Sequence, residues 1–163
     1  MTSDLSRIAA WLQPQDILLD VEARDRLHVF ELAAAASARM HGVDPAPVHR
    51  ALWRREQAGS TALGNGLAIP HACMAGIDRP CTLFLRTKDA IEFDAPDGKP
   101  VSELLFIMAP TDGAKDDHLQ LLALVARLFS DGGFRQQLRA SADAPSAADT
   151  FRSAIARTVA SPQ

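Results

Sequence analysis

Apolar positions along the chain recur with two periods, one typical of helices and one typical of strands. Residues 24–40 follow the helical spacing in an alanine-rich run, and Gly42 ends it. The pair Asp44–Pro45 supplies a cap and a first turn, and opens a second helix that stops at Gly59. Four further helices are predicted, over residues 4–13, 118–129, 131–138 and 146–155.

Strands are predicted where short runs are apolar or alternate. Residues 17–19 and 67–69 are short apolar runs, and residues 81–87 alternate and contain β-favouring side chains. Residues 104–109 are continuously apolar up to Pro110, the pattern of a central strand covered on both faces. Between these elements we expect a short extended piece, a turn and a polar loop, at 91–93, 94–100 and 111–117. This order of elements indicates a single α/β domain.

The composition and charge of the chain exclude several classes of function. The chain has 163 residues, 47% of them hydrophobic and 23% charged, which suits one domain with a full core. The formal net charge is -3 without a long basic run, so neither nucleic acid nor an anionic membrane is expected as a partner. No apolar stretch approaches the roughly 20 residues of a membrane span, and the first residues lack the pattern of a secretory signal. Two cysteines make no disulfide framework, so we expect a cytoplasmic protein.

The candidate chemistry lies in the stretch from residue 55 to residue 71. It contains three glycines that are read as turns rather than linker: Gly59, Gly64 and Gly66. The apolar run 67–69 and Pro70 then deliver His71 at the tip of a rigid element, with its imidazole toward a cleft. Histidine is the commonest side chain for proton and group transfer near neutral pH. A histidine that only caps a strand inside the core is the alternative.

The string R-E-x-x-G-S-T-x-x-G-N-G-x-A-I-P-H over residues 55–71 resembles the phosphorylation-site motif of phosphotransferase-system enzyme IIA domains. These are the EIIA type-2 domains of the fructose, mannitol and nitrogen-regulatory type. The resemblance implies one domain over residues 1–163 with its core at about 14–158, built as a central mixed β-sheet with helices on both faces. It also implies phosphotransferase activity without a cofactor, in which a phosphoryl group passes from an HPr-type carrier to His71 and then onward.

The same resemblance assigns roles to individual residues. His71 is the residue that becomes phosphorylated, at Nε2, and His118 before the long C-terminal helix helps to bind the phosphoryl group. A helix N-terminus favours an anion there and disfavours a protonated His118. Arg55 is expected to pair with phosphate oxygens, although a solvent-facing charge is the alternative, and Thr61 to donate its hydroxyl. Four residues are expected to orient the loop: Glu56, Gly64, Asn65 and Gly66.

Three alternatives remain open from the sequence. A metal site of His71, Cys73, Cys81 and His118 is disfavoured because the spacing matches no C-x-x-C pair, and no metal is expected. Residues 64–66 and 93–101 look more like the nitrogen-regulatory branch, whose partners include potassium-transport or sensor proteins. The second alternative is therefore a fructose- or mannitol-type IIA that passes phosphate to a IIB domain of a membrane permease. The third alternative is a binding protein that never accepts phosphate, and the intact motif argues against it.

Overall fold

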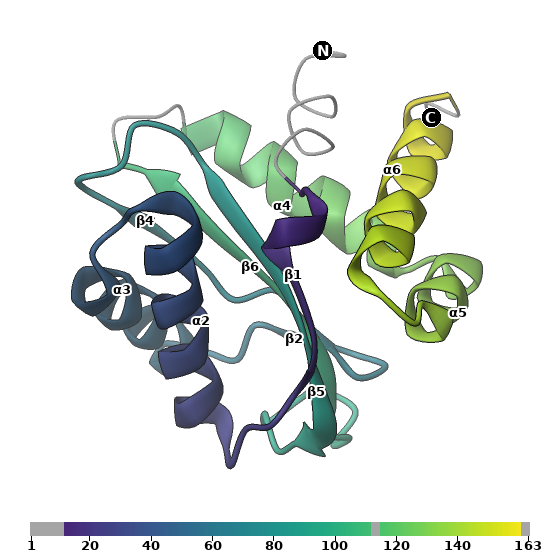
Figure 1. Ribbon diagram of the computed structural model, residues 1–163, viewed down its shortest axis with the longest axis horizontal. Helices are drawn as coiled ribbons and strands as arrows, with labels where there is room; N and C mark the ends of the chain where they lie inside the picture. The colour runs from purple at the N-terminus through teal and green to yellow at the C-terminus, as the bar shows by residue number, and fades with distance from the viewer. Residues whose placement is uncertain (1–11, 112–114, 161–163) are drawn as a thin grey trace. The chain divides into compact units, whose positions relative to one another are not determined.

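The computed structural model describes residues 12–111 and 115–160, which form two compact units (Figure 1). One unit spans residues 18–112 and contains the β-sheet with two helices. The other combines the residues up to 17 with those from 113 onward, and contains three helices and a short 3₁₀ helix.

The sheet has six strands in the order β1-β5-β6-β3-β2, with β4 paired to β6 beside this path. Its strands are β1 (Ile17–Val21), β2 (Ala62–Gly64), β3 (Leu67–Ala68), β4 (His71–Met74), β5 (Cys81–Ile91) and β6 (Val101–Pro110). β6 is the central strand: it runs antiparallel to β5 and parallel to both β3 and β4. The sheet is therefore mixed, and β6 is buried along nearly its whole length, as its continuous apolar run predicted.

Helices α2 (Arg26–His41) and α3 (Pro45–Gln57) pack together against one face of this sheet (Figure 1). Asp25 and Asp44 cap them by accepting backbone N–H groups, and Gly42 ends α2 in a left-handed conformation with φ 69°. The core on this face is centred on Phe30, whose ring contacts three other aromatic rings: Trp53, Phe93 and Phe106. Burial of these large rings stabilises this unit.

The other unit contains η1 (Pro14–Asp16), α4 (Lys115–Phe129), α5 (Gly132–Ala140) and α6 (Ala144–Ala160). Phe129, Phe134 and Phe151 each come from a different helix, and their ring centroids lie 5.3–6.2 Å apart. Asp131 caps α5 by accepting the N–H groups of the second and third helical residues, as predicted. This unit therefore has an aromatic core of its own.

The structure corrects several predicted boundaries. His71 begins strand β4, which was not among the predicted strands because its four residues acquire strand geometry only by pairing with β6. Of the extended piece predicted at 91–93, only Ile91 lies in a strand, as the last residue of β5, which it reaches through an irregular register after Arg86. The polar loop ends earlier than predicted, since α4 begins at Lys115. α6 begins two residues before Ser146 because Asp143 accepts the Ser146 N–H. The predicted helix at 4–13 lies almost entirely outside the described residues.

Candidate functional site

His71 occupies the first position of β4, directly beside the centre of the sheet. Its register partner on β6 is Ile107, and the Ile107 N–H donates to the Pro70 carbonyl at 2.9 Å. Paired residues of neighbouring strands point to the same face, so His71 shares a face with Ile107 and with Thr82 of β5. This is the face opposite to the one that α2 and α3 cover. The His71 side chain is half-buried there.

The backbone determines which tautomer of His71 is present. Nδ1 lies 2.8 Å from the carbonyl oxygen of Ile69, and a carbonyl can only accept a hydrogen bond. Nδ1 therefore carries the proton, and the lone pair of the neutral ring is on Nε2. The ring thus has its nucleophilic nitrogen at Nε2, and its orientation is held by a residue only two positions away.

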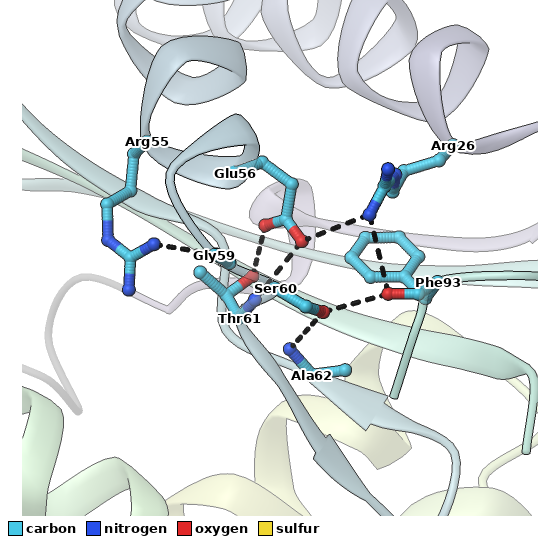
Figure 2. A network of polar contacts seen from close by, with 8 residues as sticks. All are labelled: Arg26, Arg55, Glu56, Gly59, Ser60, Thr61, Ala62 and Phe93. Carbon is cyan, nitrogen blue, oxygen red and sulfur yellow. Dashed lines mark hydrogen bonds and ion pairs between the residues drawn. The ribbon is translucent and has the colours of Figure 1, made fainter. Parts of the chain in front are cut away.

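The loop that precedes β2 is held by a buried carboxylate (Figure 2). Glu56, in the last turn of α3, is 3% exposed and accepts two hydrogen bonds from Thr61. The Thr61 N–H donates at 3.1 Å and the Thr61 hydroxyl at 2.5 Å. The Thr61 hydroxyl donates its one proton to Glu56. The expected hydrogen bond from this hydroxyl to a phosphoryl group stays a prediction.

A second anchor joins the same loop to the end of β5 (Figure 2). The Ser60 hydroxyl donates to the Phe93 carbonyl at 2.8 Å and accepts the Ala62 N–H at 3.2 Å. Arg26, the first residue of α2, lies 3.8 Å from Glu56 and 3.5 Å from that same Phe93 carbonyl. Sequence analysis did not single out Arg26, Ser60 or Phe93. Ser60 lies within the motif, whereas Arg26 is 67 residues from Phe93 and has no local pattern that would indicate its role.

Arg55 lies at the C-terminal end of α3 and folds back onto the glycine turn. Its guanidinium donates to the Gly59 carbonyl at 2.8 Å. This contact uses one of five donors of the guanidinium group, so capacity remains to bind an anion. The expected role of Arg55 as a phosphate ligand stays a prediction.

The turn between β2 and β3 is held by Asp97, which the sequence analysis placed only in a turn. Asn65 and Gly66 adopt φ angles of 58° and 80°, the geometry of a tight two-residue hairpin turn. Asp97 accepts the Asn65 N–H at 2.9 Å and the Lys99 N–H at 3.1 Å. These backbone hydrogen bonds, that from Asn65 first, lower the pKa of the Asp97 carboxyl. Gly64 has φ 90°, and a Cβ there would lie 3.3 Å from Asp97 Oδ2.

His118 is the fourth residue of α4 and belongs to the other unit. Its side chain is half-buried, and this burial lowers the pKa of the imidazole below its ordinary value of 6.5. The direction of this pKa shift agrees with the expectation from the sequence, and its cause is desolvation by burial. Its part in binding a phosphoryl group beside His71 stays a prediction.

The alternative of a metal site does not fit the sheet. Cys73 and Cys81 pair with Ala109 and Met108, which are successive residues of β6 and therefore point to opposite faces. Cys81 is buried in the core under α2 and α3, whereas Cys73 is exposed. Within residues 12–111 and 115–160, no three metal-ligating side chains form a group that could hold an ion.

Comparison with known proteins identifies the family. The family model for the phosphoenolpyruvate-dependent sugar phosphotransferase system, EIIA 2, matches residues 10–153. The chain belongs to this EIIA type-2 family. The chain is 37% identical to a nitrogen regulatory protein of Bradyrhizobium diazoefficiens over 131 residues, which is 80% of this chain and 85% of that protein. It is 30% identical to a fructose-specific EIIABC component of Bacillus subtilis, over 81% of this chain but 21% of that longer protein.

The EIIA fold is also present in solved structures. The nitrogen regulatory protein IIA-Ntr of Neisseria meningitidis superposes with a TM-score of 0.84 at 35% identity, covering 89% of this chain and 99% of that one. The predicted fold class, an α/β chain with a central mixed sheet and flanking helices, is confirmed. Across the described part of this EIIA chain, no helix combines the length and apolar character needed to cross a membrane.

Proposed function

We propose that this EIIA chain is a phosphocarrier that accepts a phosphoryl group on Nε2 of His71 from an HPr-type protein or its nitrogen-branch counterpart. One observation carries the proposal: the Ile69 carbonyl holds the Nδ1 proton of His71, which makes Nε2 the nucleophile. The residue lies at the end of the Arg55-to-His71 motif in a chain of the EIIA type-2 family. The carrier acts in the cytoplasm, as the composition predicts.

In the transfer, the Nε2 lone pair attacks the phosphorus of the carrier's phosphohistidine. The P–Nε2 bond forms as the P–N bond to the carrier breaks. The carrier's ring, which carries a proton on its other nitrogen, keeps that electron pair and leaves as a neutral imidazole. His71 retains its Nδ1 proton and becomes a phosphorylated imidazolium. As positive charge develops on the ring, the hydrogen bond to the Ile69 carbonyl strengthens, so this contact stabilises the product and the transition state leading to it.

Charge neutralisation is assigned to Arg55 and His118. Phosphoryl transfer requires mainly positioning and stabilisation of spread negative charge. Arg55 can neutralise this charge by binding phosphate oxygens with its planar donor fork, and a neutral His118 can donate one N–H hydrogen bond to the phosphoryl group.

Within the family, the role is assigned to the nitrogen-regulatory branch, in which phosphorylation controls partner binding. Nitrogen regulatory proteins that match 80% and 89% of this chain, at 37% and 35% identity, support this branch. Candidate partners are potassium-transport or sensor proteins. The second candidate function is that of a sugar-specific EIIA that transfers phosphate to a IIB domain of a membrane permease.

The test is the intact mass of the protein after incubation with phosphoenolpyruvate, enzyme I and an HPr-type carrier. Wild type should gain one acid-labile phosphoryl group, His71→Ala none, and His118→Ala a reduced or short-lived amount. His49→Ala, a helix histidine outside the motif, is the control and should behave as wild type. Unmodified wild type, with a carrier proven active on another EIIA, would exclude the phosphocarrier function.

A separate measurement distinguishes the two branches. If the regulatory role is correct, His71→Ala and His71→Asp should shift the binding of a regulatory partner in opposite directions, because only the aspartate adds negative charge. Rapid transfer of the phosphoryl group to a fructose- or mannitol-type IIB domain, with no difference in partner binding between the two variants, would favour the sugar-specific role.

A further inference from the structure

Arg26 contacts both anchors of the loop that leads to His71, although it lies in a different helix. Its guanidinium is 3.8 Å from Glu56 Oε2 and 3.5 Å from the Phe93 carbonyl (Figure 2). Glu56 holds Thr61, and the Phe93 carbonyl holds Ser60. One cation therefore joins the two hydrogen-bonded halves of the loop. Its role depends on the proposed phosphocarrier function.

Glu56 needs this cation because its carboxylate is almost completely removed from water. The Glu56 side chain is 1% exposed, and an ionised carboxylate in such a site is costly unless it is paired and hydrogen-bonded. Thr61 supplies two hydrogen bonds but no charge. Arg26 supplies the charge, so its removal would favour a Glu56 side chain that turns toward water. This movement weakens the hold of Glu56 on Thr61.

Arg26 is itself held in place by two aromatic rings. The guanidinium carbon lies 5.6 Å from the centroid of Trp53 and 5.7 Å from that of Phe93, within cation–π distance of both. A planar guanidinium can stack on rings and still donate at its edge, whereas an ammonium group cannot do both equally well. The side chain is 32% exposed, so it is a partly solvated bridge and not a core residue.

We propose that Arg26 is a positioning residue for phosphoryl transfer. Through Glu56 and the Phe93 carbonyl it fixes the backbone of Ser60 and Thr61. These residues form the loop inside the Arg55-to-His71 motif, so Arg26 helps to hold the motif in the geometry that accepts the phosphoryl group. Its removal lowers the rate at which His71 accepts phosphate, because displacing reacting groups by about 1 Å can reduce a rate by up to about a hundredfold.

The experiment compares Arg26→Met, Arg26→Lys and Arg39→Met, the last a control that removes an exposed charge from the same helix. Two quantities are measured for each: the rate of His71 phosphorylation by the phosphorylated carrier, and hydrogen exchange at the Thr61 and Ala62 amides. Arg26→Met should lower the rate by about tenfold or more and speed exchange at both amides. Arg26→Lys should recover part of both, and Arg39→Met should match wild type.

A double variant separates positioning from general stability. In Glu56→Gln there is no buried charge for Arg26 to neutralise, so adding Arg26→Met should change the rate much less than it does in wild type. Three results would overturn the role of Arg26: wild-type rate and exchange in Arg26→Met, the same loss in both backgrounds, or a rate loss explained entirely by the unfolded fraction in a urea titration. A wild-type protein that accepts no phosphate would instead overturn the proposed function, and this role with it.

Discussion

At the scale of single residues, three successive positions, Ile69, Pro70 and His71, join the imidazole to the sheet. The Ile69 carbonyl accepts a hydrogen bond from Nδ1–H of His71, and the Pro70 carbonyl accepts one from the N–H of Ile107. Pro70 has no N–H of its own to satisfy, and its φ is restricted by the ring. The imidazole and the sheet are thus joined to the same short segment, so that the orientation of the ring follows from the backbone.

His118 should titrate below its ordinary pKa of 6.5, because burial disfavours the charged imidazolium. The unfolded chain then binds more protons than the folded one between the lowered pKa and about 6.5. Stability therefore falls as pH decreases through that window and is constant above it with respect to this group. An NMR titration of the His118 ring measures the pKa directly, and His118→Gln should flatten the pH dependence of the unfolding free energy in that window. A pKa at or above 6.5 would contradict the prediction.

The sequence motif was sufficient to select the candidate residues, but not the contacts that hold them. The glycines, Asn65 and His71 belong to one continuous string with a family pattern. Arg26 and Asp97 act on that string from positions far away in sequence, since Arg26 lies 30 residues before Glu56 and Asp97 lies 32 residues after Asn65. A cation at the start of a helix and an aspartate in a turn are common residues with ordinary local roles. Only the tertiary structure brings them to the loop.

At the scale of elements, the β2–β3 hairpin depends on Gly64. Gly64→Ala should lower the unfolding free energy by about 1–2 kcal/mol, since φ 90° is unfavourable for an L side chain and the new Cβ would approach Asp97. Gly132→Ala is the matched control. Gly132 lies at the start of α5 with an ordinary φ, and a Cβ there would lie 3.5 Å from Arg135 Nη2, so this variant should be neutral or slightly stabilising. Urea unfolding of both variants measures the difference. Equal effects would contradict a specific role of the turn.

Helices and strands were predicted with unequal success for a physical reason. Caps and stops at Asp44, Gly42 and Asp131 are local signals, and the helices that they bound were placed correctly to within a few residues. β4 has no such signal, because its four residues are defined by the hydrogen bonds that they make to β6. The start of α6 was misplaced because two neighbouring residues, Asp143 and Ser146, both suit a cap.

At the scale of the whole molecule, the contacts of the chain divide into two compact units, and the single domain expected from the sequence stays a prediction. We expect a single cooperative unfolding transition. Phe106→Leu in the sheet unit and Phe134→Leu in the helical unit remove fully buried ring volume, so each should cost about 1–2 kcal/mol. Both should shift the same calorimetric transition, by about 2–4 °C per kcal/mol. Two separated transitions, each moved by only one variant, would mean that the units fold independently.

Under the proposed function, the pairing of His71 with Ile107 has a consequence for how a partner would recognise a phosphorylated form. The backbone of the modified residue is part of a hydrogen-bonded ladder, so adding a phosphoryl group does not require the chain to change shape. Under the proposed function, a partner then distinguishes the two forms by about two units of negative charge and not by a new conformation. Such a signal is screened by mobile ions, over a distance of about 8 Å at physiological ionic strength. The discrimination between the two forms is therefore greatest in dilute salt and weakens as the salt concentration of the surroundings rises.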